Sequence, residues 1–181
     1  ADILDKALMR AGRFDRQIYV ELPDLEERKA IFEVHMRPLK LNTDTASDDY
    51  ADRDFLAKQT PGFSGADIAN VCNEAALTAA RRGKSDINNQ DFSDAVDRVV
   101  GGIERKKTIM SPEEKRITAF HEAGHAVAGW LLPGCDPVLK VSIIPRGQAL
   151  GITWMLPDEK VTRSKTEILD DMCSLVAGRV A

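Results

Sequence analysis

The sequence predicts a mainly α-helical protein with a small β component. Several segments carry apolar residues at helical spacing, and most of them begin with a residue that caps a helix. Two short β-rich runs, residues 138–144 and 151–155, are separated by Pro145-Arg146-Gly147 and predict a hairpin. No apolar run approaches the roughly 18 residues that a membrane-spanning helix needs. We therefore expect these residues to form a soluble, folded unit.

The first 23 residues predict a short helix followed by a strand. The helix is indicated by the spacing of four apolar residues, Ile3, Leu4, Ala7 and Leu8. Residues 17–20 have the composition of a strand, which Pro23 would end. Because a single strand is not stable alone, we expect the rest of its sheet to lie N-terminal to this chain.

Residues 24–100 predict a compact helical bundle. Asp24 and Glu27 form a capping box, and the helix that follows is expected to end at Pro38. The turn at residues 61–67 leads into a second helix that extends to Arg82. Its buried face is predicted to consist of small and apolar residues: Ile68, Val71, Cys72, Ala75 and Ala79. Asn88, with an aspartate three residues later, begins another helix, whose apolar residues are Phe92, Ala95, Val96 and Val99.

Residues 101–110 predict a linker, because two glycines and a charged run interrupt the periodicity. A strong helix start follows at Ser111, with Pro112 at the first helical position and Glu114 completing the capping box. This helix should extend to about Leu132. After the hairpin, Ser164 caps a last helix with an apolar set: Ile168, Leu169, Met172, Leu175 and Val176.

Charge and cysteine content exclude some classes of partner and site. The 181 residues include 25 Lys and Arg against 29 Asp and Glu, giving a net charge of −4, so no uniform basic field exists to bind nucleic acid. The three cysteines are far apart in sequence and form no CxxC pair. This pattern argues against a disulfide framework or a thiolate zinc site and indicates a reducing compartment.

The sequence His121-Glu122-Ala123-Gly124-His125 has the form H-E-x-x-H and lies within a predicted helix. Positions four apart differ by only about 40° around a helix, so both imidazoles can bind one Zn²⁺ ion. The adjacent carboxylate of Glu122 can then act as the general base of a peptidase. The alternative is that the histidines are a polar stripe on a helix. No third histidine follows, so we expect the third zinc ligand beyond Ala181.

Two further segments are candidates for phosphate binding. Arg10, Arg13 and Arg16 place three guanidiniums in seven residues, which suits phosphate oxygens but is also typical of surface ion pairs, such as Arg16 with Asp15 or Glu21. Residues 83–85 (Gly-Lys-Ser) resemble the end of a phosphate loop. The first glycine of that motif is absent, so Gly83 is interpreted as a left-handed helix cap.

Three blocks of sequence resemble the FtsH-type AAA+ zinc metalloproteases. They are LDKALMRAGRFDR at residues 4–16, TPGFSGAD at residues 60–67, and HEAGH at residues 121–125. The first two are typical of AAA ATPases of this branch, and the third is typical of the protease. With the order of the blocks, the likeness covers essentially the whole chain.

The resemblance implies a role for each candidate residue. Arg10 and Arg13 would reach the γ-phosphate bound by an adjacent subunit, and Arg16 would contact that subunit. His35, Gly65 and Ala66 would lie near the nucleotide, although an exposed helix histidine is the alternative for His35. The zinc ligands would be His121 and His125, with Glu122 as general base and an aspartate well downstream as the third ligand.

The resemblance also implies a domain organisation. Residues 1–23 would end the AAA α/β subdomain, and residues 24–100 would be the AAA helical lid. Residues 101–110 would be the linker, and residues 111–181 the N-terminal part of the metalloprotease domain. The Walker A and Walker B motifs, the membrane segment and the downstream aspartate are absent from this sequence. We therefore expect the isolated fragment to be inactive.

The implied function is an ATP-dependent zinc metalloendopeptidase that unfolds and degrades membrane and soluble proteins. The implied cofactors are Zn²⁺, ATP and Mg²⁺, and the implied assembly is a homo-hexamer or a closely related hetero-hexamer. The parent protein would lie in a bacterial inner membrane with its catalytic domains in the cytoplasm, or in an organellar inner membrane. The alternative function is a non-proteolytic AAA+ remodelling ATPase or chaperone, against which the intact H-E-x-x-H sequence argues.

Overall fold

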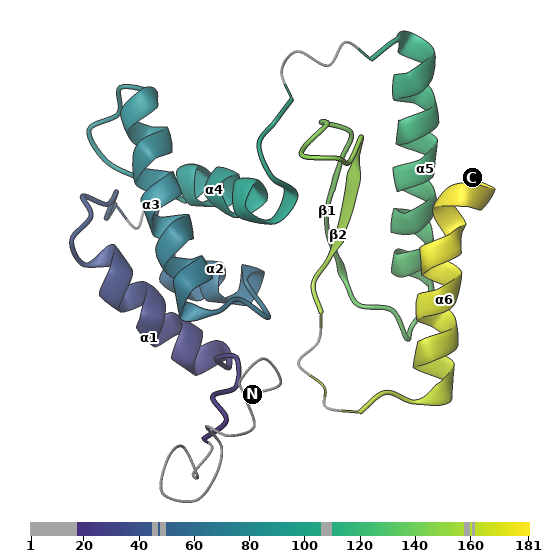
Figure 1. The fold of residues 1–181 in the computed structure, drawn as a ribbon, viewed down its shortest axis with the longest axis horizontal. Helices are drawn as coiled ribbons and strands as arrows, with labels where there is room; N and C mark the ends of the chain where they lie inside the picture. Colours follow the sequence, from purple (N-terminus) through teal and green to yellow (C-terminus); the bar gives the residue numbers. More distant parts are fainter. Residues whose placement is uncertain (1–17, 45–46, 48–49, 106–109, 158–159, 161) are drawn as a thin grey trace, which may run out of the picture.

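The computed structural model describes residues 18–44, 47, 50–105, 110–157, 160 and 162–181. Within these ranges the chain is mainly helical with one small antiparallel sheet, as predicted (Figure 1). The elements are, in order, α1 (Leu25–Met36), α2 (Arg53–Gln59), α3 (Gly65–Arg81), α4 (Asn89–Gly101), α5 (Pro112–Leu131), β1 (Val138–Ser142), β2 (Ile152–Met155) and α6 (Lys165–Val180). No helix in the described ranges is both long enough and apolar enough to span a membrane.

Helices α1 to α4 form a helical bundle around one hydrophobic core. The largest fully buried apolar side chains are Phe32, Leu56, Ile68, Val71, Phe92 and Val96. The small-residue face predicted for α3 is buried at all five positions. On α1, Phe32 is buried in this core, while Val34 is 61% exposed.

Capping boxes are present at the four helix starts where the sequence indicated them, those of α1, α4, α5 and α6, and also at the start of α3. Five helices, α1, α3, α4, α5 and α6, begin with a side chain that accepts a hydrogen bond from the backbone three residues later, and the residue at that position bonds back. Gly83 follows the end of α3 with φ +67°, the left-handed conformation expected of a helix cap. Helix α2 was not predicted. It is capped by Asp52, but its seven residues are too few to show a clear period.

The strand predicted over residues 17–20 is not observed at residues 18–20, which have no regular structure and are highly exposed. A strand needs a neighbouring strand to satisfy its backbone groups, and the sheet formed by the described residues consists of β1 and β2. The short helix predicted before it, together with Arg10, Arg13 and Arg16, lies outside the described residues.

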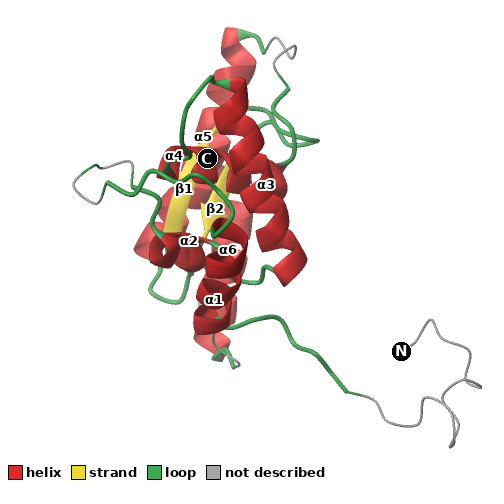
Figure 2. Cartoon of the chain, turned by 90° about the vertical axis from the view of Figure 1, so that its left-hand side faces the viewer, coloured by secondary structure: helices red, strands yellow, loops and turns green. Residues whose placement is uncertain are grey.

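The C-terminal unit consists of α5, the hairpin β1–β2, and α6. Its two helices pack along each other, and the hairpin lies between α5 and helix α4 of the bundle (Figures 1 and 2). In the sheet, Thr153 pairs with Val141 and Trp154 pairs with Lys140. Successive residues of a strand face opposite sides, so Thr153 and Trp154 lie on different faces of the hairpin. Met155 and Thr153 contact α5, whereas Trp154 packs against the core of the helical bundle.

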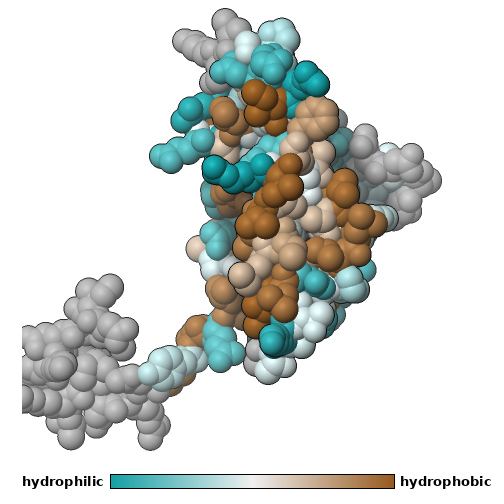
Figure 3. All heavy atoms as spheres, turned by 90° about the vertical axis from the view of Figure 1, so that its right-hand side faces the viewer, coloured by the Kyte–Doolittle hydropathy of each residue, from teal (hydrophilic) through white to brown (hydrophobic). Residues whose placement is uncertain are grey.

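Close approach of α5 and α6 depends on glycines. A Cβ built on Gly124 would lie 2.6 Å from the carbonyl oxygen of Ala177, and one built on Gly178 would lie 2.8 Å from that of His121. The apolar set predicted for α6 does not face α5. Ile168, Leu169, Met172, Leu175 and Val176 are 48–75% exposed, and the buried positions of α6 are instead Ser174 and Gly178. Figure 3 shows apolar side chains gathered on this face of the C-terminal unit.

The segment between the bundle and α5 is bonded to the hairpin loop. Arg105 N donates a hydrogen bond of 2.9 Å to Pro145 O, and Gly147 N donates one of 3.2 Å to Ile103 O. Gly102 has φ +81° and lies against the backbone of Gly147. The described part of the predicted linker is therefore held to the C-terminal unit through its backbone.

Candidate metal centre

His121 and His125 occupy successive turns of α5, as their spacing predicts. Their rings meet edge to face with centroids 4.7 Å apart, and their Nε2 atoms are separated by 3.2 Å. Two nitrogens bound at about 2.0–2.1 Å to a tetrahedral zinc ion would be roughly 3.3 Å apart. The observed separation therefore fits a pair of ligands for one ion.

Ser174 of α6 fixes the tautomer of His125. His125 Nδ1 lies 2.7 Å from the carbonyl oxygen of Ser174. Because a carbonyl only accepts, Nδ1 carries the proton and Nε2 of the neutral ring keeps a free electron pair. A metal-binding histidine commonly donates its other N–H to such a partner. Ser174 was not predicted as part of the site, since its backbone contact lies 49 residues away in sequence.

Gly178 packs directly over the His125 ring. A Cβ at this position would lie 2.6 Å from Cδ2 of the ring and still closer to Nε2. A side chain at this point would therefore collide with the candidate metal-binding nitrogen. The signal in the sequence was a glycine inside an otherwise regular helix, which is unfavourable unless something approaches closely.

Glu122 lies on the side of α5 that faces β2, and it is only 7% exposed. Thr153 Oγ1 is 2.7 Å from Glu122 Oε2 and 3.0 Å from the carbonyl oxygen of Glu122. Gly151 leaves room for the carboxylate, because a Cβ on it would lie 2.6 Å from Oε1. Neither Gly151 nor Thr153 was predicted as a site residue. The alternation of β2 could have placed them on one face, but not against Glu122.

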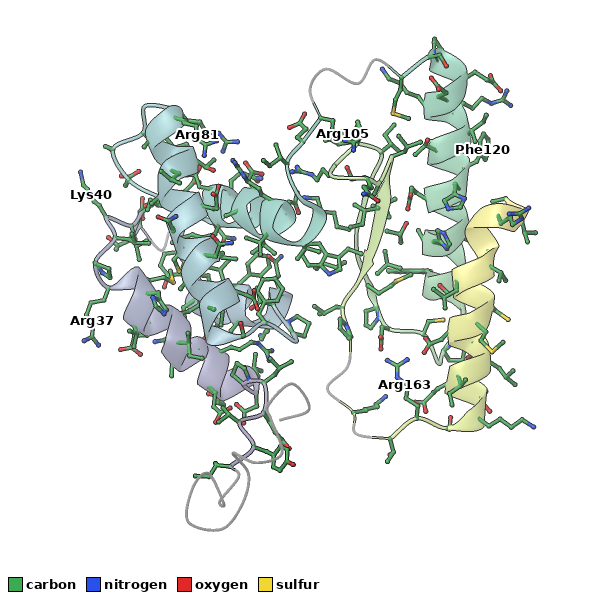
Figure 4. All side chains as sticks on the ribbon, viewed as in Figure 1. Arg37, Lys40, Arg81, Arg105, Phe120 and Arg163 are labelled. Carbon is green, nitrogen blue, oxygen red and sulfur yellow. The ribbon has the colours of Figure 1, made fainter. Side chains whose placement is uncertain are left out.

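The described residues bring two metal-binding side chains together and supply no third. No group of three or more His, Cys, Asp or Glu side chains converges within the described ranges. Beside His121 a cavity of about 660 Å³ opens between α5 and the end of α6, and Phe120 and Ile117 are among its lining residues. Figure 4 shows Phe120 on the side of α5 away from the hairpin.

A larger cavity, of about 1010 Å³, lies apart from the two histidines. It is bounded by the bundle, residues 103–105 and the hairpin loop, and its lining includes Arg81 and Arg105, both labelled in Figure 4. None of His121, Glu122 and His125 lines it. The H-E-x-x-H residues therefore contribute no side chain to this larger cavity.

The residues expected near a nucleotide lie in the helical bundle. His35 is near the end of α1 and is half-buried, while Gly65 and Ala66 begin α3. These two helices pack together, and Ile31, one turn before His35, lies 3.9 Å from a Cβ built on Gly65. They are therefore far along the chain from the H-E-x-x-H residues and on different elements.

Comparison with known proteins matches two parts of this chain to families. Residues 108–181 match peptidase family M41, and residues 51–94 match the AAA+ lid domain. The chain is 58% identical over 181 residues to an ATP-dependent zinc metalloprotease FtsH of Parabacteroides distasonis, covering 100% of this chain and 26% of that protein. It is 55% identical over 181 residues to the ATP-dependent zinc metalloprotease FtsH of Rhodothermus marinus, covering 99% of this chain and 25% of that protein.

A eukaryotic relative is similarly close. The chain is 56% identical over 180 residues to the mitochondrial inner membrane m-AAA protease component AFG3L2 of Mus musculus. That alignment covers 99% of this chain and 22% of the mouse protein. The chain thus spans about a quarter of the length of the curated relatives that it matches.

Proposed function

We propose that the intact protein is an ATP-dependent zinc metalloendopeptidase, because this chain is similar over 99–100% of its length to FtsH-type AAA+ zinc metalloproteases and matches peptidase family M41 and the AAA+ lid domain. The observation that carries the proposal is the pair of Nε2 atoms 3.2 Å apart on α5, with the carboxylate of Glu122 on the next residue. The relatives' names, which describe ATP-dependent zinc proteases, support the same reading.

In the proposed mechanism His121 and His125 would hold Zn²⁺ through Nε2, and Ser174 keeps the second ring in the required tautomer. The third ligand would be an acidic side chain downstream of Ala181. The ion, when bound, supplies Lewis acidity that polarises the peptide carbonyl and makes water a better nucleophile. Glu122 accepts the proton of the attacking water and afterwards donates it to the departing amine nitrogen.

Substrate would bind in extended form beside the hairpin. A two-stranded sheet leaves backbone N–H and C=O groups free along its outer edges, and an extended peptide can pair with such an edge. Proline substitutions along β1 and along β2 test this idea, because proline removes a backbone donor. An unchanged KM for both sets of variants would contradict it.

The ATP-dependent part of the function rests on residues of the AAA+ segment. We assign residues 1–23 to the end of the α/β subdomain, 24–100 to the lid, 101–110 to the linker and 111–181 to the start of the peptidase. Arg10 and Arg13 would contact the γ-phosphate of ATP with Mg²⁺ in a neighbouring subunit, with Arg16 contacting that subunit. His35, Gly65 and Ala66 would lie near the bound nucleotide.

This arrangement requires an oligomer, which we propose to be a homo-hexamer or a closely related hetero-hexamer. The intact protein would act on membrane and soluble proteins from the inner membrane of a bacterium, with its catalytic domains in the cytoplasm, or from an organellar inner membrane. The mouse relative is named as a mitochondrial inner membrane component, which supports the second location as well.

The test of the peptidase assignment is Glu122→Gln in the intact protein. We expect hydrolysis of an unfolded protein to be abolished while zinc content and ATP turnover stay close to those of the unaltered protein. Glu113→Gln is a matched control, because Glu113 is exposed in the first turn of α5. Proteolysis that survives Glu122→Gln would contradict the assignment, and a zinc-free protein that only remodels partners would favour a non-proteolytic ATPase.

A further inference from the structure

The carboxylate of Glu122 is in contact with Gly151 and Thr153, at and just before the start of β2. Thr153 donates a hydrogen bond of 2.7 Å to Oε2, while Oε1 faces Gly151. Gly151 lies directly before β2, and its backbone approaches the carboxylate beside Thr153. Within the described residues, Thr153 is the side chain that hydrogen-bonds this carboxylate.

The hydrogen bond from the Thr153 hydroxyl to the Glu122 carboxylate is short, at 2.7 Å, and is of the charge-assisted type. A hydroxyl has one proton, and of its two neighbours on Glu122 the charged carboxylate at 2.7 Å is a better acceptor than the carbonyl at 3.0 Å. Because Glu122 is only 7% exposed, water competes little for this contact. The contact thus fixes one carboxylate oxygen and leaves the other beside a residue that has no side chain.

We propose that Thr153 is a positioning residue that holds the Glu122 carboxylate in the orientation that proton transfer requires. The inference rests on the proposed function. Fixing Oε2 restricts rotation of the carboxylate, and the absence of a side chain at Gly151 lets the backbone of that residue pack closely against Oε1. Orientation of this kind affects the rate of the chemical step more than the binding of substrate.

The experiment compares Thr153→Val with Thr153→Ser in the intact, zinc-loaded protein. For hydrolysis of an unfolded peptide, we expect Thr153→Val to lower kcat about 10-fold to 100-fold with KM within about twofold. Thr153→Ser keeps the hydroxyl and should restore kcat to within about threefold. Zinc content should be the same in all three proteins.

A crystal structure of Thr153→Val supplies a readout that does not depend on activity, and we expect the Glu122 carboxylate to be rotated away from its position in the unaltered protein. Ser142→Ala is the matched control, since it removes a hydroxyl from β1 that accepts a bond from Ile144 N. An equal loss in Ser142→Ala, or an unchanged kcat in Thr153→Val, would overturn the inference. If Glu122→Gln itself retains activity, the proposed function fails instead, which separates the two outcomes.

Discussion

Asp97 of α4 and Lys140 of β1 form an ion pair across the boundary between the helical bundle and the C-terminal unit. Lys140 Nζ lies 2.5 Å from Asp97 Oδ2, and Arg146 of the hairpin loop reaches the same oxygen at 3.5 Å. Trp154, which pairs with Lys140 in the sheet, packs against the bundle core on this side. One face of the hairpin therefore contacts Glu122, and the opposite face holds the hairpin to the helical bundle.

Asp97→Asn is expected to lower the free energy of unfolding by about 1 kcal/mol, because both cations that lose their partner are partly exposed. A double-mutant cycle with Lys140→Gln, measured by urea unfolding, should give a coupling energy of about 0.5–1 kcal/mol. The exposed pair Glu33 and Arg37, 3.7 Å apart, is the control and should show less coupling. Equal coupling in the two cycles would contradict the prediction.

Asp91 makes the stability of the helical bundle depend on pH. Its side chain is fully buried, which by itself raises its pKa. Hydrogen bonds from Lys84 Nζ, the Asn88 backbone N–H and Arg82 outweigh this effect, so the pKa lies below the ordinary value of 3.8. A depressed pKa stabilises the fold above pH 3.8, and this stabilisation is lost as the pH falls through the lower value in the folded state.

Asp91→Asn is expected to cost about 2 kcal/mol at pH 7, because it weakens the hydrogen bonds that the buried carboxylate accepts from Lys84, Arg82 and the Asn88 backbone. It should also make stability less dependent on pH below about 4. Urea unfolding of the unaltered chain and the variant at pH 7, 4 and 3 measures both effects. Parallel loss of stability in the two proteins on acidification would contradict the assignment to Asp91.

Gly178→Ala is expected to lower the zinc affinity of the intact protein about 10-fold or more, because the added Cβ would collide with Nε2 of His125. Titration against a competing chelator measures the affinity. Val176→Ala on the exposed side of α6 is the control, since Val176 is 58% exposed. Unchanged affinity in a Gly178→Ala protein that keeps its helix content would show that α6 does not approach His125 as described.

Cys72 and Cys173 should differ strongly in reaction with iodoacetamide. Burial raises the pKa of the Cys72 thiol to about 12, and Cys72 is 3% exposed, whereas Cys173 is exposed. Since the thiolate is the reacting form, Cys72 should react about a thousandfold more slowly at pH 8. Mass spectrometry of peptides sampled over time measures each rate. The two rates should converge in urea, and rapid labelling of Cys72 in the folded protein would contradict its burial.

Local signals in the sequence predicted the capping boxes and the shared face of His121 and His125. Both depend on residues three or four positions apart, and the geometry of a helix fixes such neighbours before any tertiary contact forms. The mainly helical class, the hairpin and the left-handed Gly83 followed in the same way. Helix α2 was missed because seven residues show too little of a period. The strand predicted over residues 17–20 is not seen at residues 18–20, because a strand needs a neighbouring strand.

Contacts between distant parts of the chain were decided by the tertiary structure alone. Glu122 and Thr153 are 31 residues apart, and His125 and Ser174 are 49 apart. The apolar residues of α6 suggested that they form its buried face. Instead, the face of α6 that carries Gly178 packs on α5, because the two helix backbones can approach closely only where a side chain is absent. The sequence by itself determined which groups can bind a metal and move a proton, because that depends on side-chain chemistry and helical spacing. The fold determined how those groups are oriented, because orientation depends on the packing of α6 and β2 against α5.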